Sequence, residues 1–557
     1  MGRENNLSPV EHIKKRSNYL RGSIVESLAD PLTGALAEDD TQLTKFHGFY
    51  QQDDRDLRAD RTRRKLEPDY SFMIRVRVPG GVTTPAQWLA LDALAVSHAN
   101  NTLRLTTRQA FQFHGVKKGN VKATIRRIND SLLSTIAACG DVNRNIMCTP
   151  LAEISAVHEA AYKVAGDISE HLAPRTTAYH EIWLDKTRVA GTPDHEPIYG
   201  ETYLPRKFKI AMAIPPSNDV DVFAHDLSFI AIEKDGELAG FNVLVGGGMG
   251  VTHGEPETYP RVADVIGFCN VEQAVSVAEH VVGVQRDFGD RSNRKHARLK
   301  YTIDDRGLDW FREALAERLD FALAEPEPFQ FTSRGDRFGW QQDQRGSWHL
   351  TLFVPEGRIQ DKGRSRLLTA LRELAGIHKG EFRLTANQNL IVSGVASTDR
   401  KDVERLFEQH GVNLLQTLSP LRQQALACVA LPTCALAMAE AERYLPDLTG
   451  KIEGLLQSHG LLEESISLRI TGCPNGCARP YLAEIALVGK APGRYNLYLG
   501  GDAEGMRLNR LVEENIDETQ ILAKLDRAFA QFAGERQMSE SFGDFANRER
   551  FAEAGAN

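Results

Sequence analysis

The chain of 557 residues predicts an α+β (mixed α/β) protein, built as three domains by an internal duplication with pseudo-twofold symmetry. A pattern of strand, turn, amphipathic helix and two short strands spans residues 72–116 and recurs at residues 348–395. A second pair of similar segments follows, GFNVLVGGGMG at 240–250 and RYNLYLGGDAEG at 494–505. A chain of this length can form about three or four domains, each with its own core.

Composition and charge are those of a globular protein in water, with 42% hydrophobic and 25% charged residues. The N-terminus lacks the apolar run of a signal peptide, and no apolar stretch reaches membrane-spanning length. We therefore expect a cytoplasmic protein with no membrane partner. The net charge of −8 gives no indication of a nucleic-acid partner. Seven cysteines, an odd number, argue against a disulfide framework.

The N-terminal segment, residues 1–70, differs from both halves. Ser8, Pro9 and Glu11 follow the pattern of a capping box with proline at the first helical position. We expect a helix to begin there and to continue through residue 30. Residues 45–65 carry too many charges for a core, and such a run is more typical of a solvated arm than of a wrapping segment.

Four cysteines gather near the C-terminus, Cys428 and Cys434 in one loop and Cys473 and Cys477 in another. Five residues separate the first pair and three the second, whereas structural zinc sites most often have two. Prolines beside the thiols force irregular backbone, which leaves amides free to donate to sulfur. The pattern favours an iron–sulfur cluster over zinc. Buried, unligated cysteine is the third interpretation, and it suits the remaining Cys139, Cys148 and Cys269 better.

Positive charge concentrates on predicted strands of the first half. Arg75 and Arg77 alternate with apolar residues and therefore share one strand face. For any single motif, a solvated sheet face is the simpler interpretation. Together, without interleaved acids, these cations would repel one another unless a polyanion lay among them. The other basic and polar members of this set are Arg104, Thr106, Arg108, Gln112, His114, Arg144, Arg206, Lys207, Lys209, and the run from Arg286 to Lys300, which includes Arg298.

A glycine triplet, Gly246–Gly248, follows an apolar strand and can bring backbone close to such an anion. Three glycines also make a simple tight turn, so this signal is weak alone. The sequence shows neither a Walker loop nor a dinucleotide fingerprint. We therefore expect electrons to arrive from another protein.

These motifs resemble those of the siroheme-containing sulfite and nitrite reductases. The resemblance rests on the C-x5-C and C-x3-C cysteine pairs and on RLTTRQAFQFHG, DVNRNIMCT, YLPRKFK, LVGGGMG and LTANQN. Over nearly its full length the chain is similar to the hemoprotein (beta) subunits of assimilatory NADPH-dependent sulfite reductases. The tail after SFGDF is shorter and more polar than is typical of these subunits.

The resemblance implies ferredoxin-like half-domains at 71–145 and 345–420, which pair into one domain, plus two cofactor-flanking α/β domains. Residues 146–344 would form the siroheme and substrate side, and residues 421–557 the iron–sulfur cluster domain. The arm, residues 1–70, is a possible partner docking region.

The resemblance also implies roles for individual residues. Cys428, Cys434, Cys473 and Cys477 would bind a [4Fe-4S] cluster, and Cys477 would bridge to the siroheme iron. Arg77, Arg144, Lys207 and Lys209 would bind the substrate anion. Thr106, Arg108, Gln112, His114, Arg206 and Arg298 would line the siroheme.

The implied activity is the six-electron reduction of sulfite to sulfide, in sulfate assimilation and cysteine biosynthesis. Electrons would come from NADPH through a flavoprotein (alpha) subunit that carries FAD and FMN. Reduction of nitrite to ammonia is the closest alternative, and Lys209 favours sulfite because nitrite-specific relatives typically have asparagine there. An iron–sulfur electron carrier and a zinc-stapled binding module are alternatives from other classes.

Overall fold

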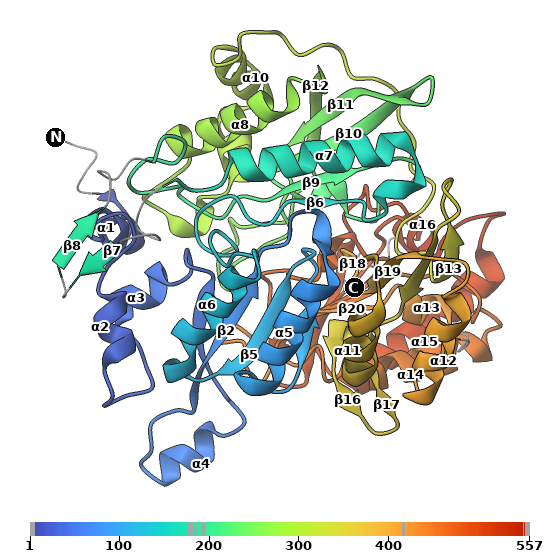
Figure 1. The fold of residues 1–557 in the computed structure, drawn as a ribbon. Coiled ribbons are helices and arrows are strands. Elements are labelled where there is room, and N and C mark those ends of the chain that lie inside the picture. Colours follow the sequence, from blue (N-terminus) through green and yellow to red (C-terminus); the bar gives the residue numbers. More distant parts are fainter. Residues whose placement is uncertain are drawn as a thin grey trace.

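The computed structural model describes residues 6–175, 182–184, 187–190, 196–414, 418–549 and 551. Its described strands form four sheets of five strands and two of two strands. In Figure 1 the two halves of the chain, blue to green and yellow to red, lie side by side. The mixed α/β class and the duplication predicted from the sequence are confirmed.

Two of the large sheets correspond to each other and exchange a strand. Their orders are β1-β2-β5-β4-β15 and β13-β14-β19-β18-β3. Strand β15 comes from the second half but pairs with β4 of the first, and β3 of the first half pairs with β18 of the second. Backbone hydrogen bonds therefore interlock the halves. The bounds are β1 (Phe49–Asp53), β2 (Tyr70–Val76), β3 (Val82–Thr83), β4 (Leu103–Leu105), β5 (Phe111–Val116), β13 (Gly339–Gln342), β14 (Trp348–Leu352), β15 (Arg358–Ile359), β18 (Glu381–Leu384) and β19 (Leu390–Val395).

Helices α5 (Pro85–Ser97) and α11 (Leu367–Ile377) pack against each other beside these sheets. A capping box at Thr84 starts α5, and Pro85 occupies its first turn. Trp88 of α5 is fully buried, with ring centroids 5.7 Å from Phe111 and 4.6 Å from Phe382. One side chain thus joins the cores of both sheets. Helices α6 (Val121–Asp130) and α12 (Arg400–Gln409) follow β5 and β19.

The other two large sheets also correspond, with orders β6-β9-β10-β11-β12 and β20-β21-β22-β23-β24. In each, the first three strands are parallel and the last two run antiparallel. The bounds are β6 (Met147–Cys148), β9 (Ile210–Ala213), β10 (Leu227–Lys234), β11 (Glu237–Val245), β12 (Asp264–Asn270), β20 (Leu426–Ala427), β21 (Leu468–Thr471), β22 (Ile485–Ala491), β23 (Arg494–Leu499) and β24 (Arg510–Ile516).

The strand registers give a residue-by-residue correspondence between the halves. Leu227 pairs with Ile210, and Ile485 pairs with Leu468 in the same parallel arrangement. The intervals between these partners have equal length in both halves. The segment from Ile210 to Leu227 therefore superimposes in sequence on that from Leu468 to Ile485, without insertion or deletion.

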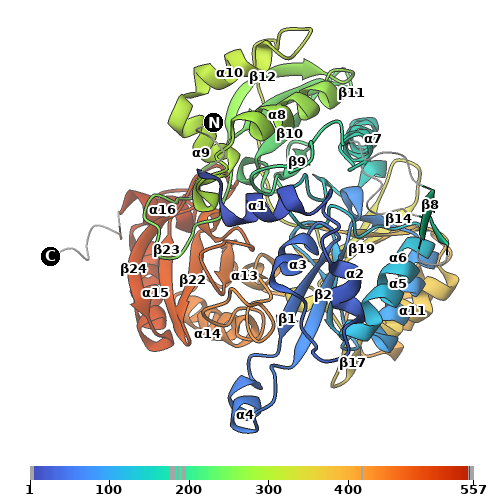
Figure 2. The same cartoon turned by 90° about the vertical axis from the view of Figure 1, so that its left-hand side faces the viewer.

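The remaining helices cover these sheets and the N-terminal side (Figures 1 and 2). They are α7 (Ala156–His171), α8 (Ala274–Phe288), α9 (Leu299–Arg306), α10 (Leu308–Ala316), α13 (Pro420–Gln423), α14 (Leu445–Ser458), α15 (Glu518–Glu535) and α16 (Phe542–Arg548). The small sheets contain β7 (Ile182–Leu184) with β8 (Thr187–Ala190), and β16 (Asp361–Lys362) with β17 (Ser365–Arg366). No helix among the described residues combines the length and apolarity needed to cross a membrane.

The N-terminal segment starts with the expected helix but differs from the prediction in two ways. Helix α1 (Pro9–Arg16) begins after Ser8, whose side chain makes no capping bond. The helix ends at Arg16 because Asn18, Tyr19 and Leu20 have positive φ, and only then does α2 (Ile24–Ala29) begin. Leu20 is fully buried, so this break serves to insert it into the core.

The rest of the N-terminal segment contains α3 (Glu38–Leu43), β1 and α4 (Arg58–Arg63). Helix α4 has no buried residue and projects from the body in Figures 1 and 2, as predicted for a solvated arm. For the first part of residues 45–65 the prediction was wrong, because Phe46 and Phe49 are buried and β1 pairs with β2. The base of α4 is anchored, because Arg55 donates through Nη1 to the carbonyl of Ala437 at 2.5 Å and through its amide to that of Pro432 at 3.2 Å. The arm is thus tied to the loop that carries Cys434.

Candidate functional site

Four cysteines of the second half lie in two loops at one edge of their sheet. Cys428 directly follows β20, and Cys434 lies in the loop beyond it. Cys473 and Cys477 lie in the loop that follows β21. Because β20 and β21 are parallel neighbours, their carboxyl ends meet at the same edge. The fold thus brings together the four thiols that the sequence singled out.

The thiols lie close enough to influence one another. Burial raises the pKa of Cys428 well above its ordinary value, and the charges of Cys477, Cys473 and Cys434 raise it further. Burial and the Cys477 charge raise the pKa of Cys473 to about 11. These raised pKa values favour neutral thiols, so a positively charged partner such as a metal centre would be needed to hold the groups as thiolates.

The spacing of these thiols bears on the kind of metal. Among the described residues, no three His, Cys, Asp or Glu side chains lie close enough to hold one metal ion. A cluster of several iron and sulfide atoms spans a wider spacing than one zinc ion does. The five- and three-residue spacings of the cysteines in the sequence remain the observation that favours an iron–sulfur cluster over zinc.

Amide groups point at two of the sulfur atoms. The backbone N–H of Gly472 donates to Sγ of Cys428 at 3.3 Å, and Nδ2 of Asn475 contacts Sγ of Cys473 at 3.5 Å. Donors of this kind stabilise thiolates and raise the reduction potential of a cluster.

Lys207 and Lys209 lie just before β9 and are half-buried. Among the residues that the structure describes, no hydrogen bond or ion pair reaches the Nζ of either lysine or the guanidinium of Arg206. Burial, Arg206 and Arg298 lower the pKa of Lys207 to about 7. Burial, Arg108 and Lys207 lower the pKa of Lys209 well below its ordinary value. The described residues supply no ion-pair partner for these cations, so the site can accept an anion from outside the protein.

The cysteine site and the cationic site adjoin each other. The Cys477 thiol opposes the lowering of the pKa of both Lys207 and Lys209, which places it within electrostatic reach of the two lysines. Cys477 is also the exposed member of the cysteine set. One site therefore receives thiols from the second half and lysines from the first.

The other two predicted anion-binding residues, Arg77 and Arg144, and the predicted siroheme-lining residue Arg298 contact the protein itself. Arg77 donates to the backbone oxygen of Ser169 and, at 2.5 Å, to its hydroxyl. Arg144 is buried, and its Nε donates to the carbonyl of Gly140 at 2.8 Å. Arg298 donates from Nε and Nη2 to the carboxylate of Asp226 at 3.0 and 2.8 Å. Of these three residues, Arg144 and Arg298 lie within electrostatic reach of Lys207.

The predicted cofactor-lining residues form two groups. Thr106 accepts through Oγ1 from the amides of Arg108 and Ala110, which shapes the turn after β4. Arg108 donates to Nδ1 of His225 at 2.9 Å, and burial together with Arg108 lowers the pKa of that histidine well below its usual range. A neutral imidazole with its proton on Nε2 matches the 3.0 Å contact to the carbonyl of Val220.

The second group lies on β5. The amide oxygen of Gln112 contacts Nε2 of His114 at 3.3 Å. His114 is buried and its Nδ1 has no partner among the described residues. Burial, and then Arg358 and Arg104, lower the pKa of His114 well below its usual range, so it is neutral. This group therefore lies against the cationic Arg104–Glu442–Arg358 cluster.

Sequence reasoning missed the residue that organises the glycine loop. Lys300 is fully buried and donates to the carbonyls of Gly248 and Gly250 at 3.0 and 2.9 Å. The next residue, Val251, donates from its amide to the carbonyl of Pro474 at 2.9 Å. The glycine loop therefore packs on the loop of Cys473 and Cys477. Lys300 stood in the basic run, but a sequence cannot distinguish a backbone partner from a ligand.

Comparisons with known proteins assign segments of the chain to described families. The family described as "Nitrite and sulphite reductase 4Fe-4S domain" matches residues 164–323, and "Nitrite/Sulfite reductase ferredoxin-like half domain" matches residues 63–131 and 341–410. The first match covers β9 to β12, the strands that follow Lys207 and Lys209. The four cysteines lie in the corresponding sheet of the second half. The predicted ferredoxin-like half-domains are confirmed.

Curated relatives match over almost the whole chain. A sulfite reductase [NADPH] hemoprotein beta-component of Myxococcus xanthus is 61% identical over 97% of this chain and 96% of its own. That of Geobacillus kaustophilus is 57% identical over 97% and 95%. Among solved structures, the Mycobacterium tuberculosis NirA protein has a TM-score of 0.80 at 25% identity and covers 99% of this chain and 98% of its own.

Proposed function

The chain belongs to the nitrite and sulphite reductase family, and from that premise we propose that it reduces sulfite to sulfide at a siroheme coupled to a [4Fe-4S] cluster. The observation that carries the proposal is that Lys207 and Lys209, which have no partner among the described residues, lie within electrostatic reach of Cys477. A thiolate set and a cationic cavity at one site suit a metal centre that takes up a small anion.

The residues present fit both groups. Four mutually repelling thiols, with an amide directed at Cys428, suit a cluster that carries positive iron charge. The orphaned Nδ1 of His114 and the unpaired Arg206 suit a macrocycle with carboxylates on its rim. In this proposal Cys428, Cys434, Cys473 and Cys477 would hold the cluster, and Cys477 would be shared between the cluster and the siroheme. Thr106, Arg108, Gln112, His114, Arg206 and Arg298 would surround the siroheme.

Bound there, the two groups would supply single electrons and a coordination position for the sulfur of sulfite. The protein would supply charge and protons. Lys207 and Lys209 would attract the dianion and hold its oxygens, because neither ammonium has a partner within the described part of the chain. Arg77 and Arg144 would provide fixed positive charge for the substrate anion.

Lys207 suits proton delivery as the oxygens of sulfite leave as water. Its pKa of about 7, set by burial and neighbouring cations, lets it give up and regain a proton near neutral pH. Arg298 is a positioning residue in this scheme. It holds Asp226, whose Oδ2 accepts from the backbone N–H of Lys209 at 2.9 Å.

We also propose an electron-supplying partner. The relatives are named beta-components of NADPH sulfite reductases, which supports a separate flavoprotein (alpha) subunit with FAD and FMN and a role in cysteine biosynthesis. The N-terminal arm remains the candidate docking region, and a cytoplasmic location remains a prediction. Nitrite reduction remains the alternative within the same site chemistry.

The test is a measurement of iron, siroheme and product on the purified protein. We expect four cluster irons and one siroheme per chain, and stoichiometric sulfide from sulfite with reduced methyl viologen as donor. Parallel assays with nitrite compare kcat/KM for the two anions. An iron–sulfur protein without a tetrapyrrole absorption band would support the electron carrier, and zinc without iron would support the binding module.

A further inference from the structure

Asp221 and Arg479 occupy equivalent positions in the duplication and touch each other. Each precedes its strand, β10 or β22, by the same number of residues. Each has positive φ, 51° and 53°, and each precedes a short 3-10 turn, Val222–Ala224 or Pro480–Leu482. Nε of Arg479 contacts Oδ2 of Asp221 in a buried ion pair. A contact between equivalent positions lies at the pseudo-twofold axis.

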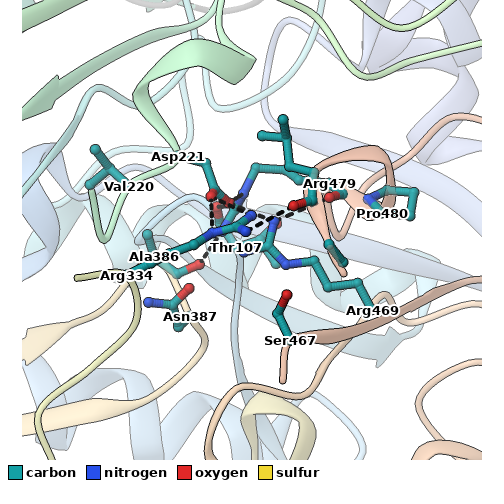
Figure 3. Close-up of polar contacts among 12 residues, drawn as sticks. Thr107, Val220, Asp221, Arg334, Ala386, Asn387, Ser467, Arg469, Arg479 and Pro480 are labelled. Carbon is teal, nitrogen blue, oxygen red and sulfur yellow. Dashed lines mark hydrogen bonds and ion pairs between the residues drawn. The ribbon is translucent and has the colours of Figure 1, made fainter. Parts of the chain in front are cut away.

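Arg479 also contacts a second pair of equivalent positions. Its Nη1 donates to the carbonyl of Thr107 at 2.8 Å, and its Nη2 donates to that of Ala386 at 3.1 Å. Thr107 and Ala386 occupy the same place in the turns after β4 and β18, whose registers correspond. One guanidinium therefore joins both halves of the ferredoxin-like domain at the axis (Figure 3).

This contact leads directly to the cysteine loop. Arg479 lies two residues beyond Cys477. Oγ1 of Thr107 donates to the carbonyl of Cys477 at 2.9 Å. Thr107 therefore makes hydrogen bonds to two residues of the same loop, Cys477 and Arg479. A shift of Arg479 would move the loop that presents the Cys477 thiol.

Asp221 holds Arg479 among like charges. Nε of Arg334 donates to Oδ1 of Asp221 at 2.8 Å, and Nη1 of Arg469 donates to Oδ2 at 2.7 Å (Figure 3). All four side chains are at most 5% exposed. Without the carboxylate, three buried guanidiniums would repel one another. Identical halves would place the same residue at both positions, so this complementary pair depends on the divergence of the two halves.

We propose that Asp221 is a positioning residue for the iron centre: it holds Arg479 on the pseudo-twofold axis and thereby fixes the loop that presents Cys477. This inference rests on the proposed function. It means that a residue of the first half, far in sequence from the four proposed cluster cysteines, helps to support the cluster. The residue acts through Arg479 and touches neither substrate nor cofactor.

The test measures release of iron to a chelator from the cofactor-loaded protein. We expect Asp221→Asn to release cluster iron on the order of tenfold faster than the wild type, as loss of an outer support does in metal sites. The control is Asp92→Asn, which removes a buried carboxylate that pairs with Nε of the half-buried Arg372 at 2.5 Å, between α5 and α11. The control should lose thermal stability but release iron at the wild-type rate.

A second comparison tests whether Asp221 acts through Arg479. The double variant Asp221→Asn with Arg479→Gln should release iron no faster than Arg479→Gln alone, since the effects share one route. Multiplied effects, or a wild-type rate in Asp221→Asn, would overturn the inference. If Asp221→Asn does not fold, Arg479→Lys carries the test, because it keeps the charge but loses the forked contacts and should also release iron faster. Wild-type protein without iron would instead overturn the proposed function.

Discussion

Oγ1 of Thr149 donates to Oδ1 of Asp219 at 2.8 Å, and these two residues stand where the second half carries Cys428 and Cys477. At this pair of equivalent positions the first half has a hydroxyl and a carboxyl group, and the second half has two thiols. Burial raises the pKa of Asp219 to about 7. A hard, proton-binding pair in one half and soft metal ligands in the other show how the duplicated scaffold came to differ in chemistry.

Cys434→Ser should abolish the proposed cluster. A serine hydroxyl is a poor ligand for iron that prefers thiolates, so iron content should fall to the level of the chelator-treated protein. The matched control is Cys269→Ser, at a buried cysteine of β12 outside the site. Iron analysis and the visible absorption spectrum check both variants, and an unchanged cluster in Cys434→Ser would contradict the ligand assignment.

Lys209→Met should leave both proposed cofactors bound but lower sulfite turnover with reduced methyl viologen. Loss of one preorganised charge contact to the reacting anion costs on the order of 10²–10³ in kcat. Lys234→Met is the control, because Lys234 is exposed and pairs with Glu327 at 2.8 Å on the far end of β10. Full activity in Lys209→Met would remove this lysine from the mechanism.

Anion binding should take up protons near neutral pH. Lys207, with its pKa of about 7, is largely neutral at pH 8, and a bound dianion raises that pKa. Sulfate affinity should therefore fall as the pH rises from 6 to 8, a range in which sulfate itself does not titrate. Calorimetry in buffers of different ionisation enthalpy measures the uptake. Lys207→Gln should flatten the pH dependence, and an unchanged uptake in this variant would assign the proton to another group.

Asp226→Asn should destabilise the protein by about 3–5 kcal/mol, because it leaves the buried guanidinium of Arg298 without its carboxylate. Urea unfolding followed by circular dichroism measures the change. Asp264, which is 41% exposed and pairs with Arg261 at 2.5 Å, provides the comparison. Asp264→Asn should cost less than about 1 kcal/mol, because Arg261 keeps its second partner Asp304. An equal decrease in the free energy of unfolding in the two variants would show that burial of the Asp226–Arg298 pair does not increase its contribution to stability.

The sequence predicted the duplication and the convergence of the thiols, because repeats and cysteine spacing are local patterns. It did not predict that Arg298 pairs with Asp226 or that Arg77 turns toward Ser169. A cation on a strand looks the same whether its partner is a ligand or a distant protein oxygen. The predicted helix through residue 30 was wrong because burial of Leu20 outweighed the helical pattern.

The exchange of β3 and β15 affects the order in which the protein can be completed during synthesis. The sheet of the first half lacks its edge strand until Arg358 and Ile359 have left the ribosome. An open edge of β4 would meanwhile be free to pair with other chains. Translation of the second half therefore sets the time at which the first half is protected from aggregation.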